Sequence, residues 1–142
     1  MPQSRFSTSI DIAARPDRVW SVMRDVERWS EWTPSVTSIE LLDGALTVGA
    51  RARVRQPRLP VALWEVTDIQ EGREFTWVSR ARGILVLARH GVAPVAGGTR
   101  ATLSIEYSGA LGPLLARLTR AINDQYLALE AEGLKARSEG SG

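Results

Sequence analysis

The sequence predicts an α+β domain in which a curved antiparallel sheet of about seven strands wraps around a long C-terminal helix. Two observations favour this fold class. Residues 36–109 hold short alternations of apolar and polar residues bounded by glycine or proline, the pattern of strands joined by turns. Residues 111–137 then change to helical spacing. A helix of roughly 25 residues is about 37 Å long and needs a large surface to cover, which only the sheet provides.

The N-terminal segment is expected to form the first strand and two short helices. Ile10 and Ile12 share one face of residues 7–12, as in a half-buried strand. Pro16 suits the first turn of a helix and precedes apolar residues at helical spacing. Pro34 ends this helical region, because the residue before a proline is disfavoured in a helix.

Six further strands are expected between residues 36 and 109. Their connections are short and contain glycines such as Gly72 and Gly97, so consecutive strands can only pair antiparallel. Most of these strands have one apolar and one polar face, which calls for one covering layer. Glu65 and Asp68 lie three residues apart and are therefore expected on opposite faces of their strand, so this spacing does not imply an acid/base pair.

The C-terminal helix is expected to supply that cover. The dipeptide Gly112-Pro113 marks its start. Its predicted buried stripe follows spacings of three and four and consists of Leu111, Leu115, Leu118, Ile122, Tyr126 and Leu129. Glu130 falls mostly away from this stripe. A single domain is expected over residues 1–137, with a disordered tail at residues 138–142.

The composition limits the function. With no cysteine, the chain has neither a disulfide, nor a thiol nucleophile, nor a cysteine-ligated metal. The N-terminus lacks the apolar run of a signal peptide and no stretch approaches the ~18 apolar residues of a membrane span, so a soluble cytoplasmic protein, monomeric or weakly dimeric, is expected. Arg51, Arg53 and Arg55 alternate with Ala52 and Val54, which indicates a solvated strand face rather than a nucleic-acid site.

A likeness to a known family extends over most of the chain, about residues 6–136. It is carried by the stretches RPDRVWSVMRDVERWSEW, VTSIELLDG, GARARVRQP, WEVTDIQEGREFTW and GGTRATLSIEYSGALGPLLARL. They resemble the polyketide cyclase/dehydrase and lipid-transport family of the SRPBCC superfamily, which implies the START-like helix-grip fold. The resemblance also implies aromatase/cyclases, hydrophobic-ligand carriers and lipid-binding domains as relatives, so it leaves the chemistry open. Its matching residues, such as Pro16, Trp29 and Gly72, have structural roles and imply no catalytic set.

His90 is the only histidine and the best candidate for a catalytic residue. Alternation along its strand places it on one face with Val86 and Ala88, and an inward ring is expected. An apolar wall would lower its pKa below about 6.5 and keep it neutral, suited to general acid/base work. The alternative is a packed histidine satisfied by a neighbour. One histidine without clustered carboxylates makes no usual metal site, and no serine lies in a Gly-x-Ser-x-Gly elbow.

A ligand cavity is expected between the sheet and the C-terminal helix. Trp64 and Trp77 are the best pocket candidates among five tryptophans, because they come from adjacent strands and can stack on a flat ligand. The predicted ligand-binding residues are Trp64, Trp77, Val86, His90, Leu103, Tyr107, Ile122, Asn123 and Tyr126.

Binding of a small hydrophobic or aromatic molecule, such as a lipid or polyketide, without a cofactor is the favoured function. A polyketide cyclase, aromatase or dehydratase using the same cavity is the first alternative, because ring closure and dehydration both move protons. A protein-interaction module is the second. Several titratable groups on the cavity wall would favour chemistry, and a dry wall would favour carriage.

Overall fold

The computed structural model describes residues 4–140 and confirms the α+β architecture. Seven strands form one antiparallel sheet with the order β1-β7-β6-β5-β4-β3-β2. The strands are β1 (Arg5–Ile12), β2 (Ser38–Leu41), β3 (Arg51–Arg55), β4 (Ala62–Gln70), β5 (Glu74–Ala81), β6 (Ile84–Val95) and β7 (Gly98–Ser108). Two short helices, α1 (Pro16–Arg24) and the 3-10 helix η1 (Val26–Glu31), follow β1, and α2 (Gly112–Leu118) and α3 (Arg120–Glu139) follow β7.

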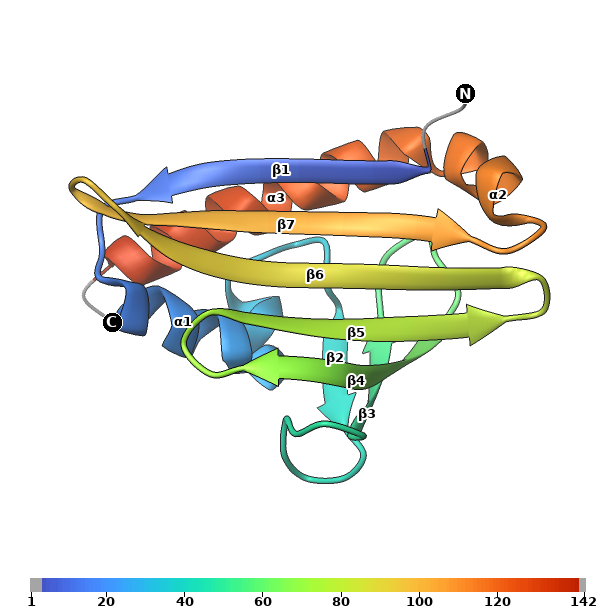
Figure 1. The fold of residues 1–142 in the computed structure, drawn as a ribbon, viewed down its shortest axis with the longest axis horizontal. Helices are drawn as coiled ribbons and strands as arrows, with labels where there is room; N and C mark the ends of the chain where they lie inside the picture. The colour runs from blue at the N-terminus through green and yellow to red at the C-terminus, as the bar shows by residue number, and fades with distance from the viewer. Residues whose placement is uncertain (1–3, 141–142) are drawn as a thin grey trace.

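The sheet curves around α3, as the sequence predicts. Strands β2 to β7 form a meander, and β1 returns to pair with β7. Figure 1 shows α3 running behind β1 and β7, with α1 toward one end of the molecule and α2 at the other. Residues paired across neighbouring strands share a face, so Phe75, His90 and Leu103 form one row on the side that faces α3.

The two short N-terminal helices close one end of the core. The apolar face of α1 buries Val19 and Met23 completely or nearly so, which the helical spacing of the sequence predicts. The ring of Trp29 in η1 is also buried, and its Nε1–H donates to the carbonyl of Met23 at 2.9 Å. A buried indole N–H needs such a partner, so this bond holds the Trp29 ring in place against the sheet.

The predicted single C-terminal helix is wrong in one respect, because the chain bends at Thr119 between α2 and α3. Thr119 has φ −106° and ψ 9°, and its hydroxyl donates to the carbonyl of Leu115 at 2.7 Å. Such a bond from a threonine back to the preceding turn bends a helix. The hydroxyl also meets the buried phenol of Tyr107, at 3.3 Å. A contact with β7 therefore accompanies the bend, and no glycine or proline marks it.

The bend also corrects the predicted stripe. Leu111 and Leu118 are 48% and 71% exposed, so both lie on the outer side of the α2 region. The face of α3 that is buried comprises Asn123, Tyr126, Leu127, Ala131, Leu134 and Ser138. The stripe predicted from an unbroken helix therefore holds for Tyr126 but is wrong for Leu118, because α2 and α3 present different faces to the sheet.

Two smaller expectations are also wrong. A β-bulge between Val66 and Asp68 shifts the register of β4 against β5. Glu65 then pairs with Val78 and Asp68 with Thr76, so the two carboxylates share a face. At the C-terminus, α3 continues to Glu139 and Ser138 is buried, so the chain is ordered beyond residue 137; residues 141–142 of the predicted disordered tail lie outside the described residues.

Candidate functional site

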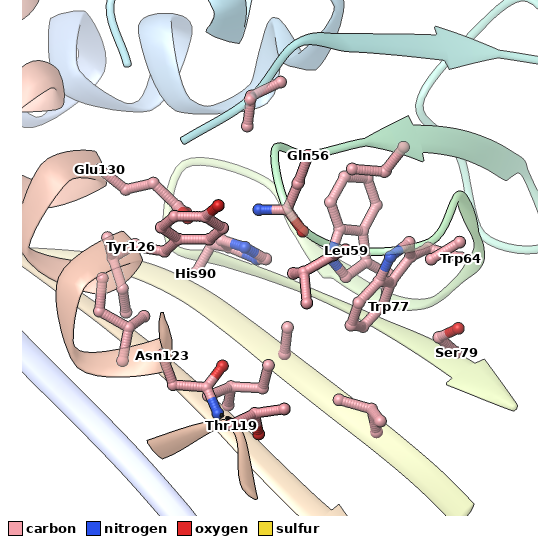
Figure 2. Close-up of a pocket in the computed structure, with 18 of the residues that line it drawn as sticks. Gln56, Leu59, Trp64, Trp77, Ser79, His90, Thr119, Asn123, Tyr126 and Glu130 are labelled. Carbon is pink, nitrogen blue, oxygen red and sulfur yellow. Dashed lines mark hydrogen bonds between the residues drawn. The ribbon is translucent and has the colours of Figure 1, made fainter. Parts of the chain in front are cut away.

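A cavity of about 250 Å³ lies between the sheet, α3 and the loop of residues 56–61 that joins β3 to β4. Most of its wall is apolar, with a few polar side chains, the usual composition of a small-molecule site. Figure 2 shows Gln56, His90, Tyr126 and Glu130 gathered on one side, Trp64, Trp77 and Ser79 on another, and Thr119 with Asn123 beside α3. The main polar groups of the wall thus come from α3, the central strands and the loop.

Three tryptophans line the cavity. The rings of Trp64 on β4 and Trp77 on β5 lie 5.8 Å apart with an interplanar angle of 35°. Trp29 from η1 lies 5.9 Å from Trp77 and joins the same wall. Trp20, by contrast, packs in the core, and its Nε1–H donates to Glu71. The adjacent-strand argument therefore places Trp64 and Trp77 correctly, and Trp29 is an additional wall residue that the sequence assigns to packing.

His90 points into the cavity, as strand alternation predicts. Its imidazole stacks on Phe75, with ring centroids 4.3 Å apart and planes 16° apart, and lies edge-on to Trp29 and Trp77. The Nδ1–H donates to the carbonyl of Phe75 at 3.4 Å, since a carbonyl can only accept. Burial lowers the pKa of His90 to about 4, a shift that this long hydrogen bond only weakly opposes. His90 is therefore neutral at pH 7, with Nε2 as a hydrogen-bond acceptor.

A second group of polar side chains forms a closed network. The Nδ2 of Asn123 lies 3.0 Å from the hydroxyl of Tyr107 and 3.1 Å from that of Thr119. The hydroxyl of Tyr107 also lies 3.2 Å from Oδ1 of Asn123. Each polar group of this network has a protein partner, which removes the penalty of burying it. The three side chains join the end of β7 to the bend between α2 and α3.

The loop of residues 56–61 forms one wall of the cavity through Leu59 and Pro60. Two contacts hold it against α3: the hydroxyl of Tyr126 donates to the carbonyl of Pro57, and the guanidinium of Arg58 donates to Gln125 at 2.8 Å. Arg58 adopts φ 66°, an uncommon conformation for a residue other than glycine. The Arg58 side chain is exposed and bonds to the exposed Gln125, so it lies outside the cavity lining.

Glu130 is an ionisable cavity residue that the sequence pattern does not indicate. It lies on α3 and lines the cavity, although the helical pattern places it away from the buried stripe. Burial raises the pKa of its carboxyl to about 7, and the hydrogen bond from the hydroxyl of Ser35, at 3.5 Å, opposes that rise. No ion pair to Glu130 is found within residues 4–140. The carboxyl is therefore half-titrated near neutral pH.

Eight of the nine predicted ligand-binding residues line the cavity: Trp64, Trp77, Val86, His90, Leu103, Tyr107, Asn123 and Tyr126. Ile122 does not lie on its wall, because the face of α3 that meets the cavity passes through the neighbouring Asn123. Gln56, Thr119 and Glu130 are wall residues without a signal in the local sequence pattern. Whether any of these residues binds a ligand stays a prediction.

Residues 4–140 hold no group of three or more histidine or acidic side chains able to bind a metal ion. The helices in this part of the chain include none that is both long and apolar enough to cross a membrane.

The sheet gripped around α3 and the cavity between them define a helix-grip protein. The family model described as polyketide cyclase/dehydrase and lipid transport matches residues 3–139, so the chain belongs to that family. No curated protein matches it at the sequence level.

Solved structures with the same fold include enzymes and a START protein. The Zhui aromatase/cyclase from Streptomyces sp. R1128 superposes with a TM-score of 0.76 at 16% identity, covering 95% of this chain and 93% of that one. The di-domain ARO/CYC protein StfQ of the steffimycin pathway gives 0.76 at 11% identity, covering 96% of this chain and 51% of its own. A START superfamily protein from Mycobacterium smegmatis gives 0.72 at 18% identity, covering 95% and 97%. At these identities the likeness shows the fold alone.

Proposed function

We propose that the protein binds a small, flat hydrophobic molecule in the cavity between the sheet and α3. The observation that carries the proposal is the cavity of about 250 Å³, whose wall is mostly apolar and holds a few polar groups. Trp64 and Trp77 offer ring surface to a flat ligand, and His90 and Glu130 offer polar atoms to orient it. A dissociation constant in the micromolar range, roughly 8 kcal/mol of binding free energy, is expected.

Two neighbouring residues of β6 provide a matched test. Val86 lines the cavity, whereas the next residue, Leu87, lies on the opposite face of the strand. Val86→Trp should fill part of the cavity and weaken binding of its ligand, and Leu87→Trp should leave binding unchanged. Calorimetric and NMR titrations with aromatic polyketides, flavonoids and fatty acids would measure both variants against the wild type. No saturable response in any of the three ligand classes would overturn the proposal and favour the protein-interaction role.

A second candidate function is that of a cyclase or dehydratase acting in the same cavity. His90 and Glu130 both line the cavity, and burial shifts their pKa values in opposite directions, to about 4 and about 7. The shift brings the pKa of Glu130 close to neutral pH, where a carboxyl can both accept and return a proton, and it keeps His90 as a neutral imidazole able to accept one. Membership of a family described as polyketide cyclase/dehydrase supports this alternative.

The pH dependence of a reaction would identify the base. Loss of water from a poly-β-ketone analogue can be followed by mass spectrometry. A rate that falls as the pH drops through about 7 would indicate Glu130 as the base, and one that falls only near pH 4 would indicate His90. The variants Glu130→Gln and His90→Gln would then each abolish the corresponding rate. An unchanged rate in both variants would remove this candidate, while binding would remain.

The location and assembly of the protein complete the proposal. We expect a cytoplasmic protein, monomeric or weakly dimeric, as the sequence predicts. Cell fractionation and sedimentation velocity would test these two statements.

A further inference from the structure

The charged groups on the cavity wall are all of one sign. Its lining residues within the described chain include one acidic side chain, Glu130, and no lysine or arginine. The chain as a whole contains 18 lysines and arginines, so this exclusion is a property of the site and not of the composition.

Three arginines of β3 and of the loop at residues 56–61 have partners outside the cavity. Arg51 and Arg53 on β3 form ion pairs with Asp43 and Glu40 on the exposed surface. Arg58, in the loop that walls the cavity, donates to Gln125 on the outside of α3. None of these cations therefore compensates a negative charge on a ligand inside the cavity.

The remaining titratable groups that face the site also offer no positive charge. They are His90 on β6, Tyr107 on β7 and Tyr126 on α3. His90 stays neutral above about pH 4 because it is buried. Ser35 and Gln56, from the segments on either side of β2 and β3, bring only neutral groups to the side of the cavity where Glu130 lies, and Nε2 of Gln56 already donates to the carbonyl of Ser35.

From this distribution we infer that the cavity selects an uncharged aromatic molecule carrying a hydroxyl or amine donor, and rejects molecules that carry a carboxylate, phosphate or sulfonate. A buried anion without a partner is strongly disfavoured, and Glu130 would add repulsion to that penalty. A ligand hydroxyl or amine, by contrast, can donate to Glu130 or to Nε2 of His90. The inference rests on the proposed binding function and names the ligand class of the same site.

Two fluorescent probes that share one aromatic scaffold and differ in charge test whether the cavity rejects an anion. N-phenyl-1-naphthylamine is uncharged, and 8-anilinonaphthalene-1-sulfonate is the same molecule with a sulfonate added. Neither probe titrates between pH 6 and 8, so any pH dependence of binding in this range belongs to the protein. At pH 8 the neutral probe should bind more tightly, by on the order of tenfold or more. Competition by 2-naphthol and 2-naphthoate should show the same order.

The charge of Glu130 can be removed in two independent ways. Lowering the pH from 8 to 6 protonates its carboxyl, whose pKa burial raises to about 7, and should tighten binding of the sulfonate probe severalfold. Glu130→Gln should tighten it at pH 8 by a similar factor and abolish the pH dependence. Glu132→Gln, on an exposed position of the same helix that does not line the cavity, is the matched control and should change neither.

The possible outcomes separate the two proposals. Tight binding of the neutral probe with weak, pH-dependent binding of the sulfonate supports both. Equal binding of the two probes by the wild type, with no effect of Glu130→Gln, overturns the charge selection and leaves the binding function intact. No binding of either probe at any pH overturns the binding function, and the charge selection with it.

Discussion

The polar side chains of the cavity wall fall into two groups that differ in how completely the protein satisfies their hydrogen bonds. In the network of Tyr107, Thr119 and Asn123, each polar group meets another protein group at 3.0 to 3.3 Å. His90 is buried and Glu130 is largely covered, and within residues 4–140 each of these ionisable side chains has one long hydrogen bond, at 3.4 and 3.5 Å. The first arrangement is complete without a ligand, whereas the second retains unused hydrogen-bonding capacity.

This difference separates a structural role from a functional one. A satisfied buried network fixes one geometry, here the junction between β7 and the bend at Thr119. Desolvated groups with few partners have shifted pKa values and respond to whatever enters the cavity. We therefore expect changes in the network to alter stability, and changes at His90 and Glu130 to alter binding and pH dependence.

The largest effect on stability is expected from Phe75→Ala. Phe75 is fully buried, stacks on His90 and contacts the rings of Trp20, Trp29 and Trp77. Its removal should cost about 3 to 5 kcal/mol, measured by urea denaturation. In the same variant the imidazole should become better hydrated, so its pKa should rise from about 4 toward 6.5 in an NMR titration. An unchanged His90 pKa would show that the stacked ring does not desolvate it.

A second effect concerns how the free energy of unfolding depends on pH through His90 and Glu130. His90 has a pKa of about 4 in the folded chain against its ordinary 6.5, so the stability it contributes is complete above pH 6.5 and is lost as the pH falls toward 4. Glu130 has the opposite sign, because its pKa rises from 4.5 to about 7 and its contribution is lost as the pH rises through that range. Each gap corresponds to roughly 3 kcal/mol, so the two slopes nearly cancel in the wild type between pH 4.5 and 6.5.

Single substitutions should expose the two slopes. Glu130→Gln should become less stable on acidification from pH 6.5 to 4.5, by about 2 to 3 kcal/mol relative to the wild type, and His90→Gln should become more stable by a similar amount. The surface carboxylates are common to all three proteins, so the differences between their profiles report the two buried groups alone. Parallel profiles from urea denaturation at several pH values would contradict this assignment.

An intermediate effect is expected from Tyr107→Phe. Loss of the hydroxyl leaves Asn123 without one of its partners in a buried position and should cost about 1 to 3 kcal/mol. Affinity for a neutral aromatic ligand should change less than it does in His90→Gln if the network is structural. A larger loss of affinity in Tyr107→Phe would place the network in the binding site, so that it could no longer be separated from His90 and Glu130 as purely structural.

The smallest effect is expected from Leu118→Ala, outside both regions. Leu118 is 71% exposed, so its truncation should change the free energy of unfolding by less than about 0.5 kcal/mol. Leu134→Ala is the matched comparison on α3, where the side chain is 1% exposed, and should cost about 2 to 5 kcal/mol. Equal costs at the two positions would show that the bend at Thr119 does not persist in solution.

Local periodicity alone determined most of the fold and part of the site. Alternation along β6 predicted that His90 lies on the inner face, because side chains on a strand alternate regardless of what covers them. An inner position among apolar residues in turn predicted a lowered pKa for His90, as burial produces. The same argument from adjacent strands placed Trp64 and Trp77 on the cavity wall. Short connections containing glycine indicated the antiparallel meander.

Only the tertiary structure decided which face of the C-terminal region meets the cavity. The bend at Thr119 accompanies a contact with Tyr107 on β7, and Glu130 meets Ser35, which is 95 residues away in the chain. Helical spacing defines a stripe on an unbroken helix, but a bend rotates the following residues relative to it. Whether a carboxyl on that helix faces solvent or a cavity, and hence its pKa, therefore depends on packing between segments that local sequence patterns do not relate.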